Sequence, residues 1–278
     1  MAAFSYRYVF RGRLKLLTAM HIGGGRGTLV PTDSPVVRTP DGRPFIPGSS
    51  FKGAFRATVE KLASALSGVS CGLLPGSGCV GAQDDAQKAF NKRRRNENWD
   101  EARLVSELAA PGVLCHTCKL FGSAFLAGKI QFDDLYLADE LDAIMQIRDG
   151  VAIDRDSEKA VDGLKYDYEV VPANYGFDLT IRLNEPDTME LALACVGVSE
   201  FGAGFGQIGG LRSRGLGRCQ LGDLRIYELD LRGADRAERL KRYLLGARLE
   251  DKMTEVPDPS QFLESAISRV LSQALAKE

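Results

Sequence analysis

Four of the six cysteines in this 278-residue chain have spacings that could bind a metal ion. Two residues lie between Cys115 and Cys118, the spacing of a zinc knuckle, whereas Cys71 and Cys79, with seven residues between them, form a looser pair. Four thiolates can complete a tetrahedral zinc site and stabilise a segment too small to form its own core. The alternative is that these thiols are reduced and bind nothing, and His116 is a substitute ligand if one cysteine does not take part.

Composition limits the class of protein. Hydrophobic residues make up 44% of the chain and charged residues 26%, which excludes wholesale disorder. With 36 basic and 37 acidic residues, the net charge of -1 neither favours nor excludes a nucleic acid as partner. No apolar run reaches about 18 residues and the N-terminus lacks a signal-peptide core, so we expect a cytoplasmic protein with no membrane partner. Disulfides are then a poor explanation for the cysteines, and we expect Cys195 and Cys219 in the core.

The segment Gly42–Arg56 contains basic residues and no acid, and it opens a predicted helix. Free N–H groups at a helix start, together with the helix dipole, can bind phosphate. Ser49 and Ser50 are candidate caps and phosphate contacts, and Lys52 and Arg56 add full charges. The alternative is a capped helix whose basic residues are solvated.

The glycine-rich segment Phe201–Gly222 is also free of acids. Gly209 and Gly210 permit close approach of a backbone, and Arg212 and Arg214 can pair with phosphates. A purely structural loop is the alternative. No glycine-rich segment ends in Gly-Lys-Ser/Thr, so binding of a nucleoside triphosphate is unsupported.

The elements that must position these residues follow from hydrophobic periodicity. The pattern predicts strands over residues 5–17, 129–137, 177–183 and 219–229, and helices over 51–66, 187–198, 234–249 and 259–276. The core order of strand, helix, strand, strand, helix, strand is that of a ferredoxin-like fold, which can present an open sheet to RNA, although other α+β folds give a similar string.

Two segments stand outside this core pattern. Residues 69–118 hold the four spaced cysteines and look inserted, while residues 148–176 alternate like a projecting hairpin. In that arm Arg148 and Arg155, with Tyr166 and its neighbour Tyr168, could contact or stack on nucleotides, or they could pair with neighbouring acids.

Five motifs occur in an order that resembles the RAMP superfamily and, within it, the backbone subunits of type III CRISPR effectors. The motifs are HIG at 21–23, DSPVVR at 33–38, PFIPGSSFKGAFR at 44–56, LFG at 120–122 and GGLRSRGLGR at 209–218. The resemblance covers roughly residues 5–230, so the cysteine segment and the C-terminal helices are less well matched.

The resemblance implies an α+β fold with a modified ferredoxin-like (RRM-like) palm. Within a single domain over 1–278, it implies a β-hairpin thumb at 148–176 and a cysteine-containing insertion at 69–118, followed by C-terminal helices at 234–278. It also implies that similar subunits stack along a guide (CRISPR) RNA, beside target RNA and other effector subunits, with each thumb kinking the guide–target duplex.

In that family a loop aspartate promotes metal-dependent cleavage of target RNA at regular intervals, and Asp33 falls on its position. By itself, an aspartate before Ser-Pro is a turn former. Beside a kinked RNA backbone, its carboxylate could hold Mg²⁺ or another divalent ion, or assist proton transfer. His21 could be a general base, but we expect it to be structural or to contact RNA.

Two other functions stay open. The chain could be a non-catalytic scaffold that holds guide RNA, with Asp33 silent at its position in the complex. It could also be a guide-processing endoribonuclease of the same superfamily, but such enzymes commonly use histidine and this chain has only His21 and His116.

Overall fold

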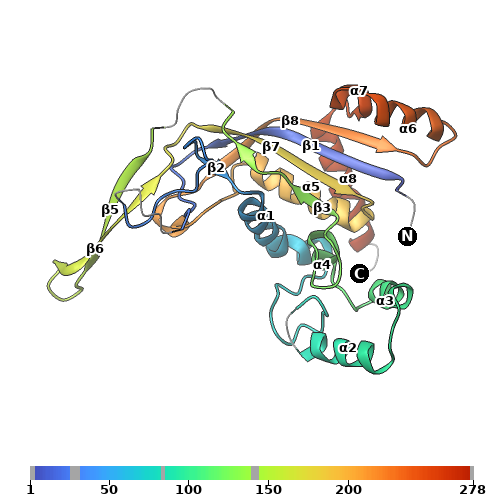
Figure 1. Ribbon diagram of the computed structural model, residues 1–278, viewed down its shortest axis with the longest axis horizontal. Coiled ribbons are helices and arrows are strands. Elements are labelled where there is room, and N and C mark those ends of the chain that lie inside the picture. The colour runs from blue at the N-terminus through green and yellow to red at the C-terminus, as the bar shows by residue number, and fades with distance from the viewer. Residues whose placement is uncertain (1–3, 26–31, 83–84, 139–143, 276–278) are drawn as a thin grey trace.

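The computed structural model describes residues 4–25, 32–82, 85–138 and 144–275. Their architecture is a mixed α/β fold around a five-stranded sheet of order β3–β7–β1–β8–β9, in which every neighbouring pair is antiparallel (Figure 1). The strands are β1 (Tyr6–Leu16), β3 (Ile130–Phe132), β7 (Gly176–Asn184), β8 (Cys219–Asp230) and β9 (Thr254–Glu255). The α+β class expected from the sequence is confirmed.

Alternation along the strands decides which face of the sheet is buried. In β7, the residues Phe177, Leu179, Ile181 and Leu183 are at most 2% exposed, as their spacing predicts. They share the main core with the apolar faces of α1 (Gly48–Leu62), α5 (Thr188–Gly202) and α8 (Pro259–Leu275). Two further helices, α6 (Arg236–Leu245) and α7 (Leu249–Lys252), pack on a second cluster with Tyr227 and Leu229 of β8.

The start of α5 follows the local sequence. The Asp187 side chain accepts a hydrogen bond from the backbone N–H of Glu190, and the Glu190 side chain accepts one from the backbone N–H of Asp187. This capping box satisfies N–H groups that a helix start leaves free. Lys129 Nζ lies 2.6 Å from the fully buried Glu190 carboxylate and neutralises it.

The start of α1 differs from the prediction. The cap residue is Pro47, and Ser49 and Ser50 lie inside the first turn, so their assignment as caps is wrong. Instead, the Gly48 N–H donates to Asp134 Oδ1 at 2.7 Å. The segment Phe132–Asp134 therefore caps this helix. It packs so closely on the helix start that a Cβ on Gly48 would lie 2.6 Å from the Phe132 carbonyl oxygen.

Three other predicted boundaries shift. The helix predicted to Leu66 ends at Leu62 and continues as a 3₁₀ turn, η1 (Ala63–Leu66). The strand predicted over 129–137 is split, because β4 (Leu135–Tyr136) leaves β3 and pairs with β2 (Phe45–Ile46) in a separate small sheet. The helix predicted over 234–249 is shorter, because α6 spans Arg236–Leu245 and ends at Gly246, and α7 begins only at Leu249.

A two-stranded hairpin projects from one end of the sheet (Figure 1). It consists of β5 (Gln146–Ile153) and β6 (Ala160–Val170), and most of its described side chains are exposed. Near its tip, Asp154 Oδ1 accepts hydrogen bonds from the backbone N–H groups of Asp156 and Ser157.

The four spaced cysteines belong to a lobe of short helices, α2 (Asp85–Asn96), α3 (Glu101–Ala109) and α4 (His116–Phe121). Figure 1 shows α2 and α3 standing away from the sheet. The lobe has its own hydrophobic cluster, in which Phe90 packs edge-on against Trp99. None of the helices in the described part of the chain is long and apolar enough to cross a membrane.

We predict opposite effects for two glycine-to-alanine changes. A Cβ on Gly197 in α5 would lie 2.2 Å from the Phe55 ring, so Gly197→Ala should lower the free energy of unfolding by about 1–2 kcal/mol. Gly53 in α1 has open space around it, so Gly53→Ala should raise that free energy by roughly 0.5–1 kcal/mol. Urea denaturation measures both, and equal effects would contradict the packing of α5 on α1.

Candidate catalytic loop and metal centre

The loop that carries Asp33 is attached to the base of the hairpin through Asp167 of β6. The Asp33 N–H donates to Asp167 Oδ1 at 2.7 Å, and the Thr32 hydroxyl donates to the same oxygen at 2.6 Å. In return, Asp33 Oδ2 accepts the Asp167 N–H at 3.2 Å. The hydrogen bonds from Thr32 and from the Asp33 backbone hold the pKa of Asp167 below its usual value. The exposed Asp33 carboxylate is therefore held beside a second, ionised carboxylate.

Glu169, two residues further along β6, is the buried anchor of this loop. It is 4% exposed, its Oε2 accepts the Val36 N–H at 3.0 Å, and its Oε1 pairs with the Arg38 guanidinium. Its own N–H donates to the Ser34 carbonyl oxygen at 3.0 Å. Sequence reasoning missed Glu169 because a glutamate in a charged, alternating arm has no local signal of burial. The only hint was its position directly before two valines.

His21 lies between these two segments. Its Nδ1 is 2.6 Å from the Glu169 carbonyl oxygen, and its Nε2 is 3.3 Å from Ser34 Oγ. A carbonyl oxygen can only accept, so Nδ1 carries the proton and Nε2 is the acceptor in the neutral ring. The Tyr168 ring packs edge-on against the imidazole at 5.9 Å. Both ring nitrogens are thus engaged, which favours a structural role over a general base.

The glycine-rich loop reaches the same place from the other end of the chain. The Gly210 N–H donates to the His21 carbonyl oxygen at 2.9 Å. A Cβ on Gly209, whose φ is +78°, would lie 2.3 Å from that oxygen, so this position requires glycine. In the 3₁₀ turn η2 (Arg212–Arg214) both arginines are exposed, and the Arg214 guanidinium contacts the Tyr166 hydroxyl.

The structure thus brings together His21, Asp33, Gly209, Gly210 and Arg214, with Arg212 beside them. Figure 1 shows these loops at the base of the hairpin. Together they form a surface that presents two carboxylates, exposed guanidinium groups and an aromatic ring, which is suited to a phosphodiester backbone.

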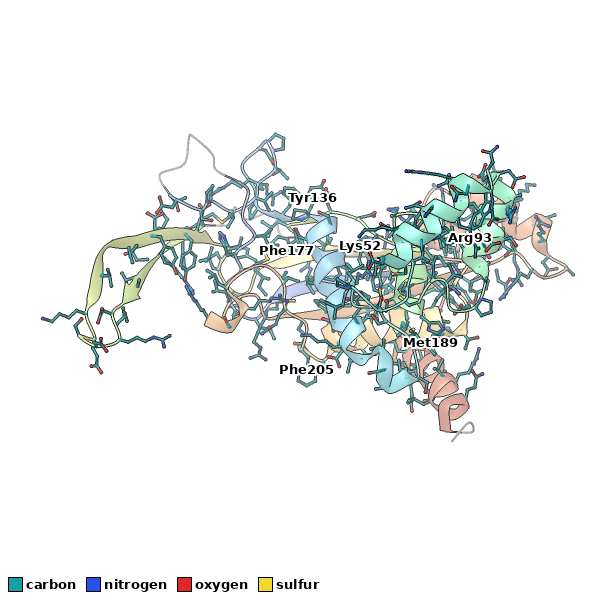
Figure 2. The ribbon with its side chains drawn as sticks, turned by 90° about the horizontal axis from the view of Figure 1, so that it is seen from below. Lys52, Arg93, Tyr136, Phe177, Met189 and Phe205 are labelled. Atoms are coloured by element: carbon teal, nitrogen blue, oxygen red, sulfur yellow. The ribbon has the colours of Figure 1, made fainter. Side chains whose placement is uncertain are left out.

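Other residues proposed from the sequence lie on other elements. Arg148 is exposed on β5, opposite Tyr168, and Arg155 lies in the turn at the hairpin tip. Ser49 and Lys52 lie on α1, with the Lys52 side chain half-buried (Figure 2). Burial and the neighbouring Arg56 charge lower the pKa of Lys52.

Cys71, Cys79, Cys115 and Cys118 are brought together although up to 47 residues separate them, and all four are buried. Their sulfur atoms lie within 4.8 Å of one another, and Sγ of Cys71 and Cys118 are 3.5 Å apart. In a tetrahedral zinc site with Zn–S bonds of about 2.3 Å, the sulfur atoms would be about 3.8 Å apart. The spacing of this cluster therefore fits a four-coordinate metal ion.

Backbone N–H groups point at two of the four sulfur atoms, which favours thiolates at Cys79 and Cys115. Cys79 Sγ accepts from the N–H groups of Gly81 at 3.4 Å and Cys115 at 3.3 Å, and Cys115 Sγ accepts from that of Cys118 at 3.4 Å. The hydrogen bond from the Cys118 thiol and then the other hydrogen bonds hold the pKa of Cys115 well below its usual value, whereas the same hydrogen bond and burial raise the pKa of Cys118, and burial raises that of Cys71. His116 is not a member of the cluster, because its Nδ1 accepts the Val69 N–H at 2.9 Å.

The two remaining cysteines are core residues, as expected. Cys195 in α5 and Cys219 in β8 are fully buried, and burial raises the pKa of each thiol to about 12.

Comparison with known proteins gives consistent matches. A family model described as the RAMP superfamily matches residues 13–220. A protein named CRISPR system Cms endoribonuclease Csm3 from Methanocaldococcus jannaschii is 47% identical over 57 residues, which is 20% of this chain and 23% of that protein. Its namesake from Enterococcus italicus is 29% identical over 168 residues, or 58% of this chain and 68% of that protein. The resemblance noted from the sequence motifs is confirmed.

We predict that Glu169→Ala lowers the free energy of unfolding by about 2 kcal/mol or more, because it leaves Arg38 and the Val36 N–H without their partner. The cost stays below that of a fully buried pair because the Arg38 side chain is 30% exposed. As a matched control, Asp149→Ala removes an exposed pair with Lys165 on the same hairpin and should leave stability unchanged. Urea denaturation of both variants checks this, and equal stabilities would refute the anchoring role.

Proposed function

This chain belongs to the RAMP superfamily, and from that premise we propose that it is a guide-RNA-binding backbone subunit of a type III CRISPR effector. We further propose that it cleaves complementary target RNA at regular intervals through Asp33. The observation that carries the proposal is the exposed Asp33 carboxylate held at the base of a projecting hairpin. The relatives named as Csm3 endoribonucleases support the same activity.

The strand order supports a ferredoxin-like (RRM-like) palm. Along the chain, α1 follows β1 and α5 follows β7, and in the sheet the strands lie in the order β3–β7–β1–β8. This is the arrangement of a β-α-β-β-α-β unit. The hairpin β5–β6 would be the thumb and the cysteine lobe would be an insertion between α1 and β3.

The proposed chemistry uses the RNA's own 2′-hydroxyl. When this hydroxyl loses its proton, its oxygen attacks the adjacent phosphorus, the bond to the 5′-oxygen breaks, and a cyclic phosphate forms. Such a reaction needs a proton acceptor and an unstacked backbone in which the attacking oxygen is aligned with the leaving oxygen. Asp33 offers a carboxylate at the surface, and the hairpin beside it offers a projecting element that could distort a duplex.

A divalent ion such as Mg²⁺ would neutralise phosphate charge and lower the pKa of the hydroxyl when bound. Carboxylate oxygens are the ligands that Mg²⁺ prefers. Asp33 is exposed and has the Asp167 carboxylate as its neighbour, so the donor set fits such an ion. Asp167 fixes the position of the Asp33 backbone and keeps a negative charge beside it.

RNA binding is proposed for the exposed cations that surround this loop. Arg212 and Arg148 are exposed near the hairpin base, and Tyr166 and Tyr168 form a stacked pair with centroids 6.1 Å apart. Exposed aromatic rings can stack on bases, and guanidinium groups pair with phosphates. On α1, Lys52 would add a phosphate contact, although Asp134 already takes up the first N–H of the helix.

A non-catalytic scaffold is the second candidate function, since every RNA contact named above would serve it equally. A guide-processing endoribonuclease is less well supported. The two histidines of the chain, His21 and His116, both have ring nitrogens that bond to the protein itself.

We also propose that the four cysteines bind a structural Zn²⁺. A structural zinc site needs no open coordination position, because four protein thiolates complete the tetrahedron.

The first test changes Asp33. In the assembled complex, Asp33→Ala should reduce the rate of target-RNA cleavage by on the order of 100-fold or more, because it removes the proton acceptor and metal ligand. Guide and target RNA should still bind, since no cation is lost. Cleavage is followed on a labelled RNA with Mg²⁺, with chelator, and with Mg²⁺ restored.

Asp41→Ala is the matched control, because Asp41 is an exposed carboxylate in the same stretch of loop. It should cleave at the wild-type rate. Normal cleavage by Asp33→Ala would leave the scaffold as the function, and cleavage of free guide precursor by the isolated chain would favour guide processing.

The second test concerns zinc. Elemental analysis of the purified chain should find about one zinc per chain, and Cys118→Ser should reduce that content severalfold because it removes one of four ligands. Cys219→Ala changes a buried cysteine outside the cluster and should retain its zinc. Equal zinc contents in the two variants would refute the assignment.

A further inference from the structure

Arg56 connects the cysteine cluster to helix α1. Its Nε donates to Glu60 Oε1 at 2.7 Å, and the other two nitrogens face the lobe. One lies 3.7 Å from Cys118 Sγ and the other 3.5 Å from the Gly122 carbonyl oxygen. The guanidinium carbon lies 5.8 Å from the centre of the Phe121 ring. The side chain is only 15% exposed, so this residue is directed into the protein rather than toward solvent.

These contacts make chemical sense for a metal-loaded cluster. A zinc ion with four thiolates carries a net charge of about -2. All four cysteines are buried, and a buried charge needs a counter-charge or hydrogen bonds. Backbone N–H groups serve Cys79 and Cys115, whereas Cys118 accepts a hydrogen bond from the Arg56 guanidinium, whose charge is shared with Glu60.

Arg56 also belongs to helix α1, whose apolar face packs in the main core. Phe55, directly before Arg56, is 1% exposed and stacks against Phe201 at 5.8 Å. Lys52, one turn earlier, lies on the acid-free half of α1. A group that holds Arg56 therefore also restrains the central turns of α1.

We propose that the Arg56 guanidinium donates a charge-assisted hydrogen bond to the four-thiolate metal site and fastens it to helix α1, so that metal occupancy sets the rigidity of that helix. This inference rests on the proposed zinc ion and is independent of RNA cleavage. Arg56 acts here as a positioning residue that works through Cys118 and makes no bond to the metal.

The test measures zinc affinity in the full-length chain. Wild type, Arg56→Gln and Arg56→Lys are titrated against a chromogenic chelator, with Lys61→Gln as control because Lys61 is an exposed cation on the same helix. Residues that contact metal ligands typically contribute 10- to 100-fold in metal affinity, so Arg56→Gln should bind zinc roughly 10-fold more weakly. Arg56→Lys keeps the charge but lacks the planar fork, so a loss of about threefold is expected.

A second readout is hydrogen exchange of the α1 amides. Exchange should accelerate in zinc-stripped wild type and in zinc-loaded Arg56→Gln, and should stay at the wild-type rate in Lys61→Gln. Unchanged zinc affinity in Arg56→Gln, or an equal loss in Lys61→Gln, would overturn the proposal. If Arg56→Gln fails to fold, Arg56→Lys decides, since wild-type affinity there overturns it as well.

The two ideas fail separately. A wild-type chain that binds no zinc refutes the metal site, and with it this role for Arg56. A chain that binds zinc and obeys the predictions above, but leaves target RNA intact in the complex, refutes only the proposed cleavage.

Discussion

The proline-rich segment between β1 and α1 depends on strand β6 for the hydrogen bonds that hold its Asp33–Val36 stretch. In the part of this segment that the structure describes there is no long helix or strand, and buried N–H and C=O groups must find partners elsewhere. Glu169 provides these partners to Val36 through its carboxylate and to Ser34 through its backbone N–H. The buried carboxylate is tolerated because Arg38 neutralises it. Asp33 lies in this segment, so its position is set by the hairpin strand.

Because of this dependence, the hairpin and the candidate catalytic loop are held together by side-chain contacts. Asp167 fixes the loop, His21 connects it to β6, and Arg214 bonds to Tyr166 on the same strand. A duplex that pressed on the hairpin would act directly on Asp33. In the proposed reaction, a carboxylate placed beside an element that distorts the substrate would align the reacting atoms only when the substrate is bound.

The cysteine lobe has only a small hydrophobic core to stabilise it. Its hydrophobic cluster is small and separate from the main core, with Phe90 and Trp99 as its largest members. Small cores stabilise a fold weakly, and a metal ion is one way to compensate. The lobe contacts the rest of the fold through Arg56 and through the chain from Phe121 to Ile130, so the cysteine cluster and α1 support each other.

Local patterns in the sequence determined the strands β1, β7 and β8, the start of α5 at Asp187, the four metal-ligand candidates and the superfamily. Periodicity and capping operate over a few residues, so they can be seen without the fold. Tertiary structure alone decided that Asp167 holds Asp33 across 134 residues, that Glu169 is buried, that Asp134 caps α1 and that Arg56 faces a cysteine. A polar side chain acquires such a role from the segment that folding brings against it, and the residues beside it in the sequence do not identify that segment.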